Sequence, residues 1–432
     1  MKIQPVKGTR DFYPQQMAVR NWITDGWKKV SLRNGFEEYD GPIFEYLKMY
    51  QIKSGEEIVE QLFSLQDRGG RDLALRPEMT PTLARMVNQQ INSLSKPIKW
   101  FSVPRMFRAE RPQKGRLREF FQWNIDIIGA DDVLADAEII FTTIDYFREV
   151  GLTSKDVKVR ISSRKLLAVI LKSYGIPSNK LESLYPILDK KAKLPAETFE
   201  EMLTEQVPDK NTLDKILQFM SVGTMPALEQ LITADSDEFI AYQQVKRVFT
   251  TLEAMGVGDF CVYDPSIVRG LAYYTGIVFE VHDAVGELRA ICGGGRYDNL
   301  LHDFGGPPIS ATGMGMGDCV LEILLREKGL LDESVSLKKL DYFVIFAEHY
   351  GGSTVYKIAA ELRSRGFTAA FSYKPKVGLS KQLKEASALK AKKCIIIGQE
   401  YVDNNQLVVK DMITSEQKQI DYDKFLADLE SA

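Results

Sequence analysis

The sequence predicts an α+β domain that is interrupted by a helical domain and followed by a smaller α/β domain. Three observations favour this fold class. Helical spacing gives way to extended segments early in the chain, strand signals almost vanish between residues 164 and 255, and strand and helix patterns alternate after Lys338. Because a domain holds roughly 100 to 200 residues, we divide the 432 residues into 1–163, 164–255, 256–332 and 338–432, with the first and third ranges forming one domain.

Composition excludes several classes of protein. A hydrophobic content of 44% and a charged content of 27% are ordinary for a globular protein. The net charge of -3 excludes a globally basic nucleic-acid coat but allows local basic patches. No run of about 18 apolar residues occurs, and the N-terminus lacks the apolar region of a signal peptide. We therefore expect a cytoplasmic protein with no membrane segment.

The cysteines give no sign of a disulfide framework or a zinc site, because none of them forms a closely spaced pair. They are Cys261, Cys292, Cys319 and Cys394.

The first elements are a helix and then extended structure. Apolar residues recur at helical spacing from Gln15 to Asn34, and Gly35 is a plausible helix stop. Further on, strand-like runs from Trp100 to Phe107 and from Leu117 to Ile128 flank a polar segment, which predicts an antiparallel hairpin. The loop of this hairpin is cationic and carries Arg108, Arg111, Lys114, Arg116 and Arg118.

The second strand of the hairpin has two different faces, because successive side chains of a strand alternate. Its apolar face carries Phe121, Trp123, Ile125 and Ile127. The other face carries Gln122, Asn124 and Asp126. Such a face either lines a polar cavity or lies in solvent, and the strand alone leaves both alternatives open.

Strand signals return after the helical region, so the first sheet is expected to resume. The predicted strands are Phe260 to Tyr263, Ile267 to Tyr274 and Ile277 to His282. Two glycine-rich runs follow, at 292–298 and at 313–317. The second run is not a dinucleotide fingerprint, since no strand, turn and helix with a following acid surrounds it. We expect these glycines to permit close packing.

The last part of the chain predicts a small α/β domain. Between Lys357 and Lys393 the sequence has ten basic residues and two acidic ones. This excess indicates either a polyanion-binding surface or ordinary solvated helix faces. The predicted elements are strand Tyr342 to Phe346, helix Ser353 to Arg365, strand Thr368 to Tyr373, helix Leu379 to Ala391 and strand Cys394 to Gly398.

Short motifs in a fixed order carry a family resemblance. They are Lys7-Gly8-Thr9-Arg10-Asp11, Gly41-Pro42, Arg76-Pro77-Glu78-Met79-Thr80, Phe107-Arg108-Ala109-Glu110 with the loop Arg111 to Arg116, Arg269 to Gly276, and Gly294 to Asp298. In this order the motifs resemble those of the histidyl-tRNA synthetases, a family of class II aminoacyl-tRNA synthetases, over nearly the whole chain. The resemblance implies a catalytic α+β domain with a mixed, mainly antiparallel sheet, a helical insertion domain and a C-terminal α/β domain.

The implied reaction has two steps, in which histidine attacks ATP to give histidyl-adenylate and pyrophosphate, and the histidyl group then passes to the terminal ribose of tRNA(His). By resemblance Arg269 and Arg108 are catalytic, and Arg108, Glu110 and Arg116 bind ATP. Guanidinium groups suit this chemistry because they are permanently charged and bind phosphate in bidentate fashion. Mg²⁺ is expected to accompany the ATP phosphates. A metal site of the protein's own is not expected.

Histidine recognition needs an anion for the ammonium group and polar partners for both ring nitrogens. The resemblance implies Glu78 for the ammonium group, Asp126 and Tyr274 for the imidazole, and Tyr297 to close the pocket. Tyr273 is interpreted as packing. The full implied set is Glu78, Thr80, Gln122, Asp126, Tyr274, Tyr297 and Arg269.

Partners follow from the same resemblance. A homodimer is implied, with the helix from Gln15 to Asn34 at the interface. The helical insertion is implied to clamp the acceptor arm of the tRNA, and the C-terminal domain to read the anticodon arm. We expect phosphate contacts from Lys381, Lys384, Lys390 and Lys393.

Two positions depart from the family pattern. Ala272 replaces a usual aspartate, and Val320 stands where class II motif 3 has an arginine over the adenine. Arg296 and Arg326 are candidate substitutes for that arginine. The departure supports an alternative of another class, a non-catalytic synthetase-like protein that binds histidine and regulates. A synthetase for another amino acid is disfavoured, because the segment after Arg269 is specific to the histidine group.

Overall fold

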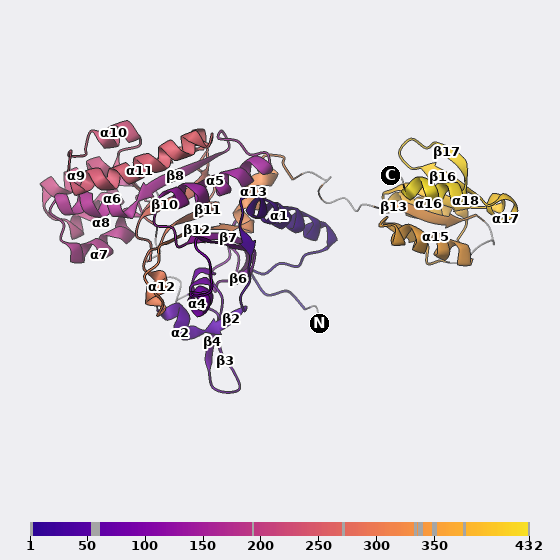
Figure 1. The fold of residues 1–432 in the computed structure, drawn as a ribbon, viewed down its shortest axis with the longest axis horizontal. Coiled ribbons are helices and arrows are strands. Elements are labelled where there is room, and N and C mark those ends of the chain that lie inside the picture. The colour runs from indigo at the N-terminus through magenta and orange to yellow at the C-terminus, as the bar shows by residue number, and fades with distance from the viewer. Residues whose placement is uncertain are drawn as a thin grey trace. The chain divides into compact units, whose positions relative to one another are not determined.

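The computed structural model describes residues 3–52, 61–191, 194–269, 273–331, 335, 340–347, 352–374 and 377–430. It contains two compact units (Figure 1), of which the larger comprises Met1–Tyr13 and Val19–Asp332, and the smaller Pro14–Ala18 and Glu333–Ala432. The predicted boundary at Lys338 and the basic residue Lys376 lie outside the described residues. Among the described helices, none is long and apolar enough to cross a membrane.

A nine-stranded sheet forms the centre of the larger unit. Its strand order is β1-β5-β7-β12-β11-β10-β8-β9, and β6 also pairs with β7. The pairs β1/β5 and β8/β9 are parallel and the others are antiparallel, which confirms the mixed, mainly antiparallel sheet. In chain order the strands are β1 (Glu37–Glu38), β5 (Ile98–Ser102), β6 (Arg105–Phe107), β7 (Glu119–Ile128), β8 (Val157–Ser163), β9 (Cys261–Tyr263), β10 (Ile277–Asp283), β11 (Cys292–Arg296) and β12 (Ala311–Gly317).

The predicted hairpin is present, because β5 and β6 both run antiparallel to β7. Its apolar face packs against helices. Trp123 of β7 lies 6.2 Å from Trp27 and 5.6 Å from Tyr146, measured between ring centroids, and all three side chains are fully buried. The two partners come from α1 (Pro14–Arg33) and α5 (Leu134–Glu149). Helix α1 ends where predicted, with Gly35 at a φ of 77°.

A smaller sheet carries the next motif into the larger unit. It has the order β2-β4-β3, with β2 at Phe44–Tyr46, β3 at Ser64–Gln66 and β4 at Asp72–Leu75. Helix α2 (Leu47–Gln51) follows β2. Helix α4 (Thr80–Gln90) begins after β4 and has Pro81 in its first turn, where the missing N–H costs no hydrogen bond. The turn between β4 and α4 therefore holds Arg76 and Glu78.

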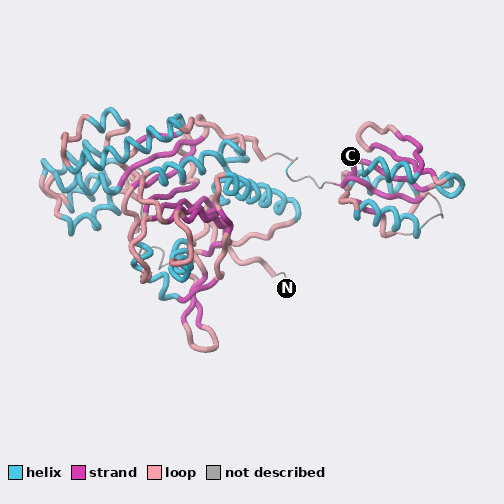
Figure 2. Tube along the Cα trace, viewed as in Figure 1, coloured by secondary structure: helices cyan, strands magenta, loops and turns pink. Residues whose placement is uncertain are grey.

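The region between β8 and β9 is helical throughout its described residues, as the sequence predicts, and Figures 1 and 2 show it as one block of helices. Two prolines mark helix starts here, since Pro195 precedes α8 and Pro226 lies in the first turn of α10, whereas Pro186 lies inside α7. The elements are α6 (Arg164–Ser173), η1 (Ser178–Lys180), α7 (Leu181–Leu188), α8 (Ala196–Gln206), α9 (Lys210–Met220), α10 (Met225–Glu229), α11 (Asp237–Ala254) and η2 (Gly258–Phe260).

One strand prediction in the larger unit is wrong. Within 264–269 and 273–276 the structure has no strand, so Ile267 to Tyr274 is not the strand that its apolar residues indicate. Arg269 has a φ of 65°, which an extended strand does not allow. Short helices α12 (Leu300–Asp303) and α13 (Asp318–Glu327) follow β11 and β12.

The smaller unit is an α/β domain with a five-stranded sheet of order β14-β13-β15-β16-β17. The first three strands are parallel, as strand and helix alternation predicts, while β16 and β17 form an antiparallel extension that the sequence analysis missed. The helix predicted to reach Ala391 ends at Ala388, because Lys390 turns the chain with a φ of 53°. The elements are β13 (Leu340–Phe346), α15 (Gly352–Ser364), β14 (Ala369–Phe371), α16 (Leu379–Ala388), β15 (Ala391–Ile397), α17 (Gln399–Asn404), β16 (Gln406–Asp411), β17 (Gln417–Asp421) and α18 (Tyr422–Glu430).

Candidate active site

The polar face of β7 lines a cavity, and this outcome decides between the two alternatives that the strand left open. Gln122, Asn124 and Asp126 all line it. All seven residues predicted to bind histidine are in its lining, together with Arg108. Segments far apart in the sequence are therefore brought to one place by β7, by the turn before α4, and by the loop and strands after β9.

Glycines of β12 leave room for the polar side chains of β7. Gly313 of β12 lies opposite Asp126, and Gly315 lies opposite Asn124. A Cβ atom on Gly313 would lie 2.0 Å from Asp126 Oδ1, and one on Gly315 would lie 2.9 Å from Gln122 Nε2. Any side chain at either position would displace the polar groups of β7. The glycine runs thus permit close packing, as expected from the sequence.

Tyrosine hydroxyls contact the two carboxylates of the cavity lining. The Tyr297 hydroxyl donates to Asp126 Oδ1 over 2.5 Å. Burial raises the pKa of Asp126 to about 7, although the Tyr297 hydrogen bond acts in the opposite direction. Tyr273 donates to Glu78 Oε2 over 3.1 Å and its ring lies 5.0 Å from that of Tyr274. Tyr273 is therefore a polar partner of the site, and the interpretation of this residue as packing alone is wrong.

Three contacts position Arg269, and a glycine leaves room for its side chain. Its backbone N–H donates to Asp189 Oδ1 over 2.9 Å, and its Nη1 lies 2.6 Å from Glu280 Oε1. Its guanidinium carbon lies 5.8 Å from the ring centre of Tyr274. A Cβ atom on Gly293 would lie 2.3 Å from Arg269 Nη1, so this glycine leaves room for the guanidinium group. Ala272, three residues further on, lies outside the described residues.

The ion pair with Glu280 keeps both side chains charged. Burial lowers the pKa of Arg269, but Glu280 and Tyr274 together outweigh burial, so the pKa is raised. For Glu280, burial raises the pKa, while Arg269 and His282 bring it down to about 2. The sequence analysis missed Glu280. The alternation of β10 contains the signal, because Glu280 and His282 are polar residues on one face of an otherwise apolar strand.

A second cavity adjoins the first and contains the residues predicted to bind ATP. Arg108, Glu110 and Arg116 all line it, and Arg116 forms an ion pair with Glu110. Arg108 and Arg269 line both cavities. The volume of the second cavity is about 240 Å³, against about 80 Å³ for the first. Two compartments of different size thus meet at two arginines.

Val320 is part of the wall of the second cavity, at the start of α13. A Cβ atom on Gly115 would lie 3.0 Å from Val320 Cγ2, so the motif 2 loop packs on this apolar side chain. Two residues earlier, Asp318 accepts from the Phe121 backbone N–H over 3.0 Å and pairs with Arg10 at 2.5 Å. In this motif, Asp318 therefore holds the N-terminal segment through Arg10. Val320 supplies apolar surface to the cavity and carries no charge.

Neither candidate substitute for the missing arginine is in the cavity lining. Arg296 is buried and forms an ion pair with Asp136 at 2.6 Å, and it also donates to the Ser310 hydroxyl. Arg326 pairs with Glu322 along the exposed side of α13. Arg296 is thus a structural residue, and the proposal of either as a replacement is wrong. The arginines present in this cavity are Arg108, Arg116 and Arg269.

In the described part of the chain, no three His, Cys, Asp or Glu residues gather in a way that would hold a metal ion. The carboxylate in the second cavity, Glu110, is engaged by Arg116.

The sheet is mainly antiparallel and carries two cavities. The smaller is acidic and lined by tyrosines, the larger is cationic, and two arginines line both. This is the arrangement that the resemblance implies for a class II aminoacyl-tRNA synthetase. Comparison with known proteins gives the particular family. A family model described as histidyl-tRNA synthetase matches residues 8–317, and one described as anticodon binding domain matches residues 344–431. The chain belongs to the histidyl-tRNA synthetase family.

Individual relatives match this chain over almost its whole length. The chloroplastic/mitochondrial histidine–tRNA ligase of Arabidopsis thaliana is 39% identical over 428 residues, which cover 99% of this chain and 86% of that protein. The histidine–tRNA ligase of Opitutus terrae is 37% identical over 414 residues, covering 95% and 94%. The crystal structure of histidyl-tRNA synthetase from Nostoc sp. PCC 7120 matches with a TM-score of 0.82 over 100% of this chain and 99% of that chain. At 23% identity, this last likeness shows the fold.

Proposed function

We propose that the chain attaches histidine to tRNA in two steps, with histidyl-adenylate as the intermediate. The observation that carries this proposal is the junction of two cavities at Arg108 and Arg269. The first step joins an amino-acid carboxylate to the α-phosphorus of ATP and releases pyrophosphate. One substrate in each cavity would bring the reacting atoms to the arginines that neutralise the developing charge.

Histidine binds in the smaller cavity. Glu78 receives the ammonium group, and its hydrogen bond from Tyr273 holds the carboxylate in place. Asp126 accepts from one ring nitrogen while Tyr297 fixes its orientation, and Tyr274 meets the other nitrogen. Thr80 and Gln122 complete the polar lining. A cavity that hydrogen-bonds a polar ring rejects apolar side chains of the same size, because its own polar groups would be left unpaired.

ATP binds in the larger cavity. Arg108 and Arg269 contact the α-phosphate from the two sides, and Arg116 contacts the outer phosphates. The Glu280 ion pair positions Arg269, so the guanidinium group needs little reorganisation when negative charge forms. Val320 provides apolar surface for the adenine end.

Magnesium enters with the nucleotide. Mg²⁺ keeps much of its water and binds ATP through phosphate oxygens. Since the carboxylate of the larger cavity is paired with Arg116, we assign the ion to the phosphates, and no step depends on a resident metal.

The smaller unit binds the anticodon arm of tRNA(His). Lys381, Lys384, Lys390 and Lys393 are all exposed in it, which suits phosphate contacts made without desolvation. We further propose a homodimer in the cytoplasm. Large apolar side chains at the end of α1 and around β2 are at least 48% exposed and would be covered by a second copy: Leu32, Ile43, Phe44 and Tyr46.

Histidine-dependent exchange of pyrophosphate into ATP tests the enzyme against the regulatory alternative. The purified chain should catalyse exchange without tRNA, and histidine should be required. A protein that binds histidine but gives no exchange would be the regulatory alternative instead.

A further inference from the structure

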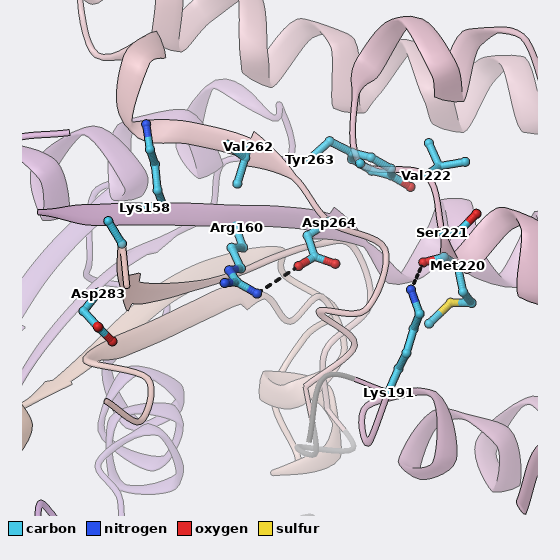
Figure 3. A pocket seen from close by; sticks show the side chains of 12 residues that line it. Lys158, Arg160, Lys191, Met220, Ser221, Val222, Val262, Tyr263, Asp264 and Asp283 are labelled. Carbon is cyan, nitrogen blue, oxygen red and sulfur yellow. Dashed lines mark hydrogen bonds and ion pairs between the residues drawn. The ribbon is translucent and has the colours of Figure 1, made fainter. Parts of the chain in front are cut away.

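A third cavity, of about 300 Å³, lies between the sheet and the helical insertion (Figure 3). Lys158 and Arg160 of β8 line one side, and Lys191 with the turn between α9 and α10 lines the other. Asp264, which follows β9, and Asp283 at the end of β10 are also in the lining. None of these residues has a role in adenylate formation.

Both carboxylates of this cavity already accept hydrogen bonds from other groups of the chain. Asp283 accepts from the backbone N–H groups of Glu287 and Leu288 over 3.1 and 2.9 Å. Asp264 accepts from Ser266 and pairs with Arg160 at 3.4 Å. The acidic groups therefore do not neutralise all three cations.

The two lysines are held by backbone carbonyls. Lys191 donates to the Met220 carbonyl, as Figure 3 shows, and Lys158 donates to the Asp259 carbonyl over 2.7 Å. Burial lowers the pKa of Lys191, with the charge of Asp264 acting against it. Two ammonium groups at the edge of a half-open cavity would thus gain from an anion.

The register of the sheet puts this cavity on the same face as the active site. Arg160 lies directly opposite Glu280, and Glu280 lies directly opposite Gly293. Directly opposite residues share a face, and Arg269 covers Gly293 on that face. With about 4.8 Å between strands, the backbone of Arg160 is about 10 Å from that of Gly293.

We propose that this cavity binds a backbone phosphate of the single-stranded 3′ end of the tRNA as it enters the active site. The inference rests on the proposed function, because the terminal ribose must reach the adenylate beside Arg269. The nucleotides next to that ribose must then pass within about two strand spacings, or about 10 Å, of Arg269. Arg160 lies on that face and at that distance, and Lys158 and Lys191 line the same cavity.

The ATP phosphates do not require these cations. Arg108, Arg116 and Arg269 already line the cavity assigned to ATP. A phosphodiester also carries a single charge, which matches an excess of one cation over the two carboxylates. The cavity is thus assigned to RNA and not to the nucleotide or pyrophosphate.

The test uses the full chain and two RNA hairpins that contain only the acceptor stem, one with the 3′ single strand and one without it. The variant is Lys158→Gln with Lys191→Gln. Its matched control is Lys165→Gln, because Lys165 is exposed on the neighbouring α6 and is outside the cavity lining. Binding is measured at several salt concentrations, and histidine-dependent exchange is measured in parallel.

The double variant should bind the hairpin with the 3′ strand about tenfold more weakly, while the truncated hairpin binds as before. The slope of log K against log salt should become shallower by about 0.7 for each phosphate that the variant no longer neutralises. Exchange should keep the parent rate, and Lys165→Gln should change neither quantity.

Equal binding of the longer hairpin by parent and double variant would overturn the proposal. A parallel loss of exchange would also overturn it, because the cavity would then serve the first step. If the parent itself gives no exchange, the proposed function fails, whereas the hairpin measurement still tests the cavity.

Discussion

The two cavities of the sheet unit and the C-terminal unit both carry cations that we assign to phosphate-bearing substrates, but they hold these cations in opposite ways. Arg269 is largely buried, with 18% of its side chain exposed, and is fixed by Glu280, Asp189 and Gly293. The lysines of the C-terminal unit lie in solvent on α16 and β15 and in the turn between them.

The difference follows from what each region must do. A buried charge is weakly screened and acts strongly on a nearby phosphate, but it needs a counter-charge in order to be buried at all. An exposed lysine costs no desolvation and supplies affinity that salt weakens. The paired groups inside the sheet unit therefore suit orientation for chemistry, and the solvated groups of the C-terminal unit suit attraction of a polyanion.

The largest expected effect is that of Arg269→Ala. Removing a charge aimed at the developing phosphate charge should lower pyrophosphate exchange about 10³-fold, near the upper end for a single such donor. The oligomeric state should not change, as checked by sedimentation. Arg326→Ala is the control, since Arg326 pairs with Glu322 on the exposed side of α13. Near-normal exchange in Arg269→Ala would show that its charge is not needed for the first step.

Asp126→Asn should lower kcat/KM for histidine about 10²-fold, because a charged hydrogen bond to the ring is removed. The free energy of unfolding of the variant should instead rise relative to that of the parent as the pH increases. Burial raises the pKa of Asp126 to about 7, above the ordinary value of about 3.9 in an unfolded chain. Between these values the native state holds a proton that the unfolded state has released, so the stability of the parent falls as pH rises.

The asparagine variant lacks this fall. Its free energy of unfolding relative to the parent should therefore rise from pH 4 to pH 8, by a difference on the order of 4 kcal/mol. Urea unfolding at the two pH values measures it. A constant difference between variant and parent would mean that Asp126 is not buried as an acid.

Gly293→Ala should lower exchange about tenfold without removing any charged group. The new methyl group would meet Arg269 Nη1 at 2.3 Å, and also the Phe279 carbonyl at 2.9 Å, so the guanidinium group must move. Gly378→Ala in the C-terminal unit is the matched control, because a Cβ atom there meets nothing within 4 Å. Equal exchange by the two variants would contradict the tight positioning of Arg269.

Individual lysines of the C-terminal unit should have the smallest effects. Replacing one of Lys381, Lys384, Lys390 and Lys393 by Ala should weaken tRNA binding about twofold, in the range of an exposed ion pair. The fourfold variant should also flatten the salt dependence of binding. Pyrophosphate exchange should not change. A fall in exchange would mean that these lysines act in the first step.

Sequence reasoning located much of the site because local patterns carry it. Alternation along 119–128 separated the residues that pack on Trp27 from those that line the cavity, and the motif order gave roles to Glu78, Arg108 and Arg269. Patterns failed where a long-range contact decides the outcome. The apolar pattern predicts a strand at Arg269, whereas the structure has no strand there: the residue has a φ of 65° and its backbone N–H bonds to Asp189.

The same reason explains the other corrections. Tyrosine and arginine occur both as structural residues and in functional sites. Only the residues that Tyr273 and Arg296 contact show which role each one has. Tyr273 contacts Glu78, which is 195 positions away, and Arg296 contacts Asp136, which is 160 positions away. Neither partner can be inferred from spacing.

The sequence by itself determined the fold class, the helical insertion and most of the residues that reach the site, because periodicity and motif order are local properties of the chain. The tertiary structure decided which charges are paired, which glycines make room for them, and that Val320 faces the larger cavity without a replacement from Arg296. It also placed Lys158 and Lys191 beside the active-site face. These outcomes depend on strand register and long-range contacts, which exist only once the chain has folded.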